Sequence, residues 1–138
     1  MIGVPHQLSF GVQHAYSPSD DGATVPVSLS VGGDPVKVFA KIDTGATYCF
    51  FERGLAEALL IDVERVPPIP VSTMGGTFQA YGHELTLTVL GIEVEALVYF
   101  YEDRNATRNV LGRNGWLNRV RLGLIVHDSL LYLSAYDD

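Results

Sequence analysis

Residues 36–51 read VKVFAKIDTGATYCFF, and this stretch decides the fold. Apolar side chains stand at every second position of Val36–Ile42, a period typical of a strand that buries one of its faces. The strand stops at Asp43, and Gly45 permits a tight backbone turn two residues later. Another apolar run follows this turn. The pattern therefore predicts a carboxylate in a semi-buried turn between two strands.

Strand signals dominate the chain on both sides of this turn. Period-two alternation or short apolar runs predict further strands over residues 6–14, 25–31, 85–89, 92–100, 110–111, 122–126 and 130–133. A long hairpin is expected to begin at Val71 and to turn at or near Met74–Gly76. Helical spacing occurs in Arg53–Leu60, and Gly112–Asn118 is expected to form one helical turn or more. We predict an all-β, barrel-like domain with one or two short helices.

Length and composition fit a single domain. The chain has 138 residues, of which 47% are hydrophobic and 18% charged, enough for one packed core. We expect this core at about residues 25–133, preceded by an N-terminal extension at 1–22. The formal net charge of −7 argues against nucleic acid or an anionic membrane as a partner. One cysteine, no leader pattern and no long apolar run together favour a cytoplasmic protein.

The tripeptide Asp43-Thr44-Gly45 has two interpretations. One is an ordinary turn, in which the aspartate bonds to its own backbone. The other is catalysis by two facing carboxylates, which share one proton because like charges so close cannot both ionise. The ionised member takes a proton from a trapped water, and the protonated member donates to a peptide carbonyl oxygen. This chemistry needs no metal and no cofactor.

No residue pattern in the sequence predicts a metal site. The four histidines show no close metal-ligand spacing. Cys49 stands on an expected core strand, and we interpret it as a buried, inert thiol rather than a nucleophile.

Three motifs, in this order, resemble the retropepsin-like (retroviral-type) aspartic proteases. Ile42–Ala46 resembles the active-site loop of that family, and Met74–Gly76 resembles its glycine-rich flap. Val110–Asn114 resembles the second signature, in which Gly-Arg-Asn follows two apolar residues and opens a helix. Glu52–Glu64 looks like a helix of the bacterial and cellular single-domain relatives, which viral members lack. The resemblance implies an acid-protease barrel and an aspartic endopeptidase.

The resemblance assigns a role to each residue of the active-site loop. Asp43 is the catalytic carboxylate. Thr44 would use its hydroxyl to hold the two active-site loops of a dimer together. Gly45 would keep the loop tight and donate its backbone N–H to the carboxylate, and Ala46 completes the loop.

The flap and the second signature supply the remaining candidate residues. The flap comprises Met74, Gly75 and Gly76. It would cover a bound peptide, although Gly-Gly also occurs in ordinary hairpin turns. The structural signature comprises Gly112, Arg113 and Asn114. Viral members commonly pair this arginine with an acidic residue, but Thr47 occupies that position here. Two other carboxylates are candidate partners, those of Glu52 and Asp103.

A single Asp-Thr-Gly occurs in the chain, since no other aspartate begins such a tripeptide. One carboxylate cannot take both roles, so an active enzyme must be a twofold-symmetric homodimer with one Asp43 from each protomer. The apolar termini, residues 4–12 and 130–136, are candidates for strands shared between protomers. The substrate would be an extended peptide or protein segment. The alternative is a catalytically inactive, dimeric peptide-binding or assembly module with the same fold.

Overall fold

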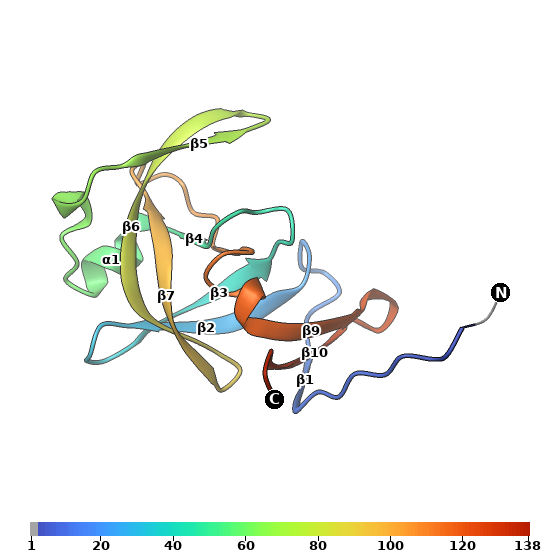
Figure 1. Cartoon of the computed structure of the whole chain (residues 1–138). Helices are drawn as coiled ribbons and strands as arrows, with labels where there is room; N and C mark the ends of the chain where they lie inside the picture. The colour runs from blue at the N-terminus through green and yellow to red at the C-terminus, as the bar shows by residue number, and fades with distance from the viewer. Residues whose placement is uncertain (1–2) are drawn as a thin grey trace.

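The computed structural model describes residues 3–138, and strands make up most of its regular structure. In chain order the elements are β1 (Val12–Ala15), β2 (Thr24–Ser30), β3 (Val36–Ile42), β4 (Phe50–Phe51), α1 (Arg53–Ala58), η1 (Val63–Arg65), β5 (Ile69–Thr73), β6 (Gly76–Val89), β7 (Ile92–Tyr101), β8 (Val110–Leu111), η2 (Leu117–Arg119), β9 (Val120–Ile125), η3 (Val126–Asp128) and β10 (Leu130–Ala135), where η marks a 3-10 helix. The predicted all-β class is confirmed (Figure 1). No helix of residues 3–138 is both long and apolar enough to cross a membrane. Met1 and Ile2, at the start of the expected N-terminal extension, lie outside the described residues.

The larger sheet closes into a ring, because its first strand, β2, also pairs with β6. Its order is β2-β3-β8-β4-β7-β6-β5, and β2 pairs in addition with β6. Residues 27–30 of β2 face residues 86–89 of β6, so β2 has a neighbour on each side. Strand β5 lies outside this ring and pairs with the first part of β6 alone, from Thr73↔Gly76 to Ile69↔Ala80. The β5–β6 hairpin therefore projects from the ring, as Figure 1 shows at the top of the molecule.

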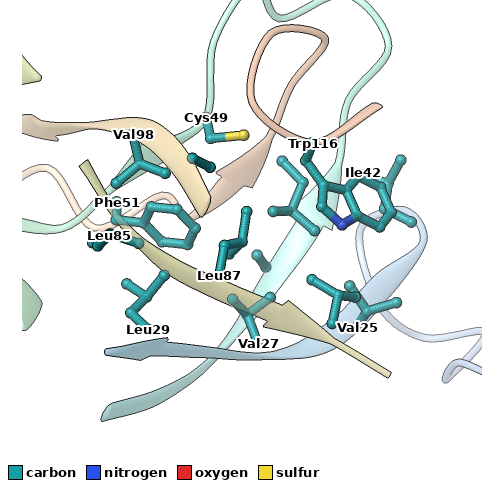
Figure 2. Close-up of a cluster of buried hydrophobic side chains, with 14 of the residues drawn as sticks. Val25, Val27, Leu29, Ile42, Cys49, Phe51, Leu85, Leu87, Val98 and Trp116 are labelled. Atoms are coloured by element: carbon teal, nitrogen blue, oxygen red, sulfur yellow. The ribbon is translucent and has the colours of Figure 1, made fainter. Parts of the chain in front are cut away.

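The core fills the inside of this ring. In β6, Leu85 and Leu87 are buried while Glu84 between His83 and Leu85 is exposed, as period-two alternation requires. Fully burying one such side chain stabilises the fold by about 1.5–3 kcal/mol. Figure 2 shows side chains from several strands converging on this core, and the labelled residues are Val25, Val27, Leu29, Ile42, Cys49, Phe51, Leu85, Leu87, Val98 and Trp116.

A three-stranded sheet, β1-β10-β9, closes one side of the core. Its central strand β10 sends Leu131 and Leu133 into the core, and both are fully buried. The residues before β1 cross the opposite face of this sheet, where the Gly11 amide donates to Ser134 Oγ at 2.7 Å. The strand predicted for residues 6–14 forms over Val12–Ala15, and the preceding chain runs out from the body (Figure 1).

The helix expected at Gly112–Asn118 is wrong in its first half. Residues 112–116 form an irregular segment with turns at residues 113, 115 and 116 and a parallel bridge from Asn114 to Tyr48, and a single 3-10 turn follows at Leu117–Arg119. The amides of Arg113 and Asn114 bond to the carbonyls of a neighbouring loop instead of to a helix of their own. Gly115 has a φ of +109°, so a right-handed helix cannot run through this residue. The first helix agrees better with its prediction, since α1 begins at Arg53 and ends at Ala58.

Candidate active site

Asp43 lies where β3 ends beside the parallel strand β8. The pairing Ile42↔Leu111 continues as a hydrogen bond of 3.0 Å from the Asp43 amide to the Leu111 carbonyl. The chain then turns, and the Ala46 amide returns to the Asp43 carbonyl at 3.1 Å. The Asp43 side chain is half-buried and accepts a 2.9 Å hydrogen bond from the Gly45 amide to Oδ1. A fixed backbone donor thus holds a carboxylate at the surface end of a core strand.

The turn faces outward after Asp43. Thr44 and Gly45 are exposed, and Ala46 is half-buried. A Cβ at Gly45 would lie 3.2 Å from Asp43 Oδ1, a tight contact that would push on the carboxylate. Glycine at this position therefore lets the backbone approach the carboxylate closely.

Gly112 packs directly beneath the turn. A Cβ there would lie 2.1 Å from the Tyr48 carbonyl oxygen and 2.8 Å from the Ala46 carbonyl oxygen. Backbone atoms cannot move aside as a flexible side chain can. Any residue other than glycine would therefore displace either the Ala46–Tyr48 segment or the segment that contains Gly112. The signature glycine thus sets the distance between the Asp43 turn and the chain after β8.

Arg113 and Asn114 join the same two segments through their backbones. The Arg113 amide donates to the Ala46 carbonyl at 2.9 Å, and the Asn114 amide donates to the Thr47 carbonyl at 2.8 Å. The Arg113 guanidinium bonds to Thr47 Oγ1 at 3.3 Å, so Thr47 itself is its partner. The two carboxylates considered from the sequence are engaged elsewhere, Glu52 with Asn109 Nδ2 at 2.7 Å and Asp103 with the Asn105 amide at 2.8 Å.

Cys49 is buried below these loops and is unsuited to nucleophilic attack. Its Sγ accepts the Gly112 amide at 3.4 Å. Burial raises the pKa of the Cys49 thiol to about 11, and the hydrogen bond from the Gly112 backbone offsets only part of this effect. The thiol is therefore protonated at neutral pH. The described residues hold no cluster of three or more His, Cys, Asp or Glu that would suit a metal ion.

The Asp43 turn borders a cleft of about 1080 Å³. One wall is a group of aromatic rings from β4, β6 and β7, with ring centroids 5.9 Å apart for Phe50 and Tyr101 and 5.3 Å apart for Phe78 and Tyr101. The β5–β6 hairpin contributes Val71, Ser72, Thr73 and Met74, and the loop before β8 contributes residues 105–108. The volume is suited to a short segment of peptide.

The hairpin beside the cleft turns where the sequence predicts. Its two-residue loop is Met74-Gly75, closed by the pair Thr73↔Gly76. Gly76 has a φ of +128°, and Thr73 Oγ1 donates to its carbonyl at 3.0 Å. Met74 is fully exposed at this tip. Of the three flap-like residues, the structure brings Met74 to the cleft beside Asp43, and Gly75 and Gly76 are not among the described residues that line it.

Sequence reasoning missed the aromatic wall and Arg108. Phe50 and Tyr101 come from strands far apart in the chain that become neighbours through the parallel pairing of β4 with β7. That pairing is not encoded in any local motif. The one usable signal was the density of aromatic residues in 99–101, which suits a core strand equally well.

Comparison with known families agrees with the geometry. A family described as Aspartyl protease matches residues 27–115, a span from β2 to just beyond the Gly-Arg-Asn signature. It includes Asp43, the β5–β6 hairpin and Gly112. No curated protein matches the chain. Since the match covers well over half of the 138 residues and bears out the resemblance of the motifs, the chain belongs to the aspartyl protease family.

Proposed function

We propose that the protein is a retropepsin-like aspartic endopeptidase whose active site forms between two copies of this chain, each contributing Asp43. The observation that carries the proposal is the Asp43 turn itself. Its carboxylate is held by the Gly45 amide at 2.9 Å and borders a cleft of peptide size. A second Asp-Thr-Gly is missing from the sequence, so the second carboxylate must come from another chain.

The proposed reaction divides two roles between the two Asp43 side chains. The ionised carboxylate takes a proton from water, whose oxygen attacks the carbonyl carbon of the peptide bond. The protonated carboxyl donates its proton to the carbonyl oxygen, which gives a neutral tetrahedral diol. Collapse of the diol breaks the C–N bond: the protonated carboxyl gives its proton to the nitrogen, which leaves as an amine, and the ionised carboxylate takes the proton of one diol hydroxyl, whose oxygen becomes the carbonyl oxygen of the product acid. The dyad again holds one proton at the end of the cycle. The Gly45 amide supports the ionised carboxylate at Oδ1.

The β5–β6 hairpin supports binding of an extended peptide. Strand β5 ends the order of the larger sheet, so its outer edge is free of strand pairing within the described chain. An edge of this kind offers backbone donors and acceptors to an added strand, while side-chain pockets supply preference. We propose that Met74, Gly75 and Gly76 act as a flap over the peptide and that their glycines allow it to open and close.

Substitution of Asp43 by Asn tests the proposal. The two side chains have nearly the same shape, so we expect an unchanged circular dichroism spectrum and melting temperature. Cleavage of a peptide library should fall to background, because an amide can neither activate water nor share the proton. A statine-type peptide analogue, which carries a hydroxyl in place of the scissile bond, should inhibit the wild-type protein. Full peptidase activity in Asp43→Asn would refute the proposal, and a wild-type protein that binds peptides without cutting them would favour an inactive binding module.

A further inference from the structure

We propose that Arg108 makes the peptidase prefer substrates that carry an acidic side chain close to the cleaved bond. The ligand of the guanidinium is the carboxylate of an Asp or Glu residue in the bound peptide. This inference rests on the proposed function, because it concerns which peptides enter the cleft beside Asp43.

The charge of the cleft is the first argument. Among the cleft-lining residues in the described part of the chain, Asp43 and Arg108 carry charge, and the rest are apolar, aromatic or uncharged polar. Asp43 is assigned to the reaction, so Arg108 is the charged group available to bind a substrate side chain. Arg108 is exposed and lines the cleft, so a carboxylate of a bound peptide can reach its guanidinium.

Arg108 has no acidic partner of its own. Over residues 3–138, no carboxylate lies within 4.0 Å of its guanidinium, whereas Arg53 and Arg104 both pair with Glu57. Two carboxylates border the smaller pocket next to the cleft, and both have other partners. Glu102 accepts from the Tyr81 hydroxyl at 3.2 Å, and Asp103 accepts from the amide two residues on. In a chain of net charge −7, an unpaired guanidinium in a cleft is available to a ligand.

The backbone at Arg108 is fixed, so the point from which its exposed side chain reaches into the cleft is defined. The Tyr101 hydroxyl donates to the Arg108 carbonyl at 2.8 Å. Asn109 is held to Glu52 twice, from Nδ2 to the carboxylate at 2.7 Å and from the Glu52 amide to Oδ1 at 2.9 Å. Asn109 thus points away from the cleft, while Arg108 and Val110 line it, as alternation along an extended chain requires.

The register of β3 and β8 limits how far the carboxylate lies from the cleaved bond. Ile42 pairs with Leu111, so Asp43 lies level with Gly112, four positions beyond Arg108. Four extended residues span about 13 Å, part of which the arginine side chain can cover. The selected acidic residue should therefore lie within about four positions of the scissile bond.

Paired peptide substrates test this assignment. A peptide that the wild-type protein cleaves is remade with Glu or Gln at each of the four positions on either side of the cut, and kcat/KM is measured for each pair. At one position the Glu peptide should be cleaved roughly three- to thirtyfold better than the Gln peptide, the range expected for one charge-assisted contact. The ratio should fall to about one in Arg108→Gln.

Two further variants make the test specific. Arg65→Gln is the matched control, since Arg65 is exposed on η1, has no acidic partner within the described residues and does not line the cleft. It should keep the wild-type ratio. Arg108→Glu should reverse the preference, so that Lys at the selected position is cleaved better than Glu. A wild-type ratio near one at every position, or a Glu preference that survives in Arg108→Gln, would overturn the inference and leave the peptidase itself standing.

A binding measurement separates failure of this inference from failure of the proposed function. The Asp43→Asn protein keeps the cleft, so its affinity for fluorescent Glu and Gln peptides can be measured without cleavage. Tighter binding of the Glu peptide that disappears in Asp43→Asn/Arg108→Gln supports the role of Arg108, even if no peptide is ever cut. Equal binding of the two peptides by Asp43→Asn contradicts it.

Discussion

At the scale of single residues, Gly112 joins the Asp43 turn to the rest of the core. Its missing side chain lets the chain after β8 pass against the Tyr48 carbonyl, where a Cβ would stand 2.1 Å from the oxygen. The same approach allows its amide to reach Cys49 Sγ. Both the position of the Asp43 turn and the burial of the thiol depend on this one contact between backbones.

Gly112→Ala should therefore be strongly destabilising. The new methyl group meets backbone atoms on two sides, so one strand must shift, at a cost of about 3 kcal/mol or more. Urea denaturation followed by tryptophan fluorescence measures the change, because Trp116 is fully buried. Gly54→Ala is the control: Gly54 lies in α1, a Cβ there would have no atom within 4 Å, and alanine should stabilise by up to about 1 kcal/mol. Equal midpoints for the two variants would contradict this account.

Cys49 gives the fold a dependence on alkaline pH. Its pKa is raised from an ordinary value of 9.0 to about 11 by burial, so the folded protein holds the thiol proton more tightly than the unfolded chain. The stability due to this proton is complete below about pH 9 and is lost as the pH rises toward 11. Within that window the free energy of unfolding should fall by about 1.4 kcal/mol per pH unit more in wild type than in Cys49→Ala.

The comparison with Cys49→Ala isolates this thiol. Tyr101, whose pKa burial raises to about 12, contributes in the same direction, but it is present in both proteins and cancels. Urea midpoints at pH 8 and pH 10 are sufficient. Parallel loss of stability in the two proteins would show that the thiol titrates alike in the folded and unfolded chains.

At the scale of elements, the β5–β6 hairpin depends on the conformation of its second glycine. Gly76 has a φ of +128°, which a side chain opposes, whereas Gly75 has no positive φ and only Thr73 Oγ1 near its Cβ position, at 3.9 Å. Gly76→Ala should strain the tip by about 1–3 kcal/mol, and Gly75→Ala should not.

Hydrogen exchange can follow this strain locally. In Gly76→Ala the amides of the hairpin, such as those of the pair Val71↔Phe78, should exchange about five- to 150-fold faster than in wild type, while buried amides of β2 should be unchanged. If the hairpin covers the substrate, the KM of the peptidase should also be higher in Gly76→Ala than in wild type. The same exchange rates in Gly75→Ala and Gly76→Ala would show that backbone conformation at residue 76 does not govern the hairpin.

The elements also show what local sequence could and could not predict. Alternation placed β2, β3 and the last part of β6, residues 85–89, because each buries one face and the period survives folding. The helix prediction for the segment after Gly112 was wrong, because the amides of this segment bond to the loop at Ala46 and Thr47. That loop lies more than sixty residues earlier in the chain. The motif located Asp43 and its Gly45 donor. It contained no information on the aromatic wall, which forms through pairing of distant strands.

At the scale of the whole molecule, the small sheet restricts how two chains can join. Strand β10 is paired with β9 from Leu130 to Ala135 and with β1 from Leu130 to Leu133. A strand from a partner therefore cannot add to β10 itself over residues 130–133. It would have to add at the outer edge of β1 or β9, or pair with the chain beyond Leu133. The terminal strands that two protomers could share are therefore limited to these positions.

Mixing active and inactive chains tests whether two copies build one site. If each site needs two Asp43 residues, a wild-type chain paired with an Asp43→Asn chain should be inactive. With equal amounts and random pairing, about half of the wild-type chains would sit in mixed dimers, so activity per wild-type chain should drop to about half and fall further with excess variant. Gly54→Ala, added in the same amounts, should leave activity per active chain unchanged, because it alters neither Asp43 nor the cleft. Activity that ignores the Asp43→Asn chains at every ratio would mean that one chain suffices, and the second carboxylate would then have to be sought within this protomer.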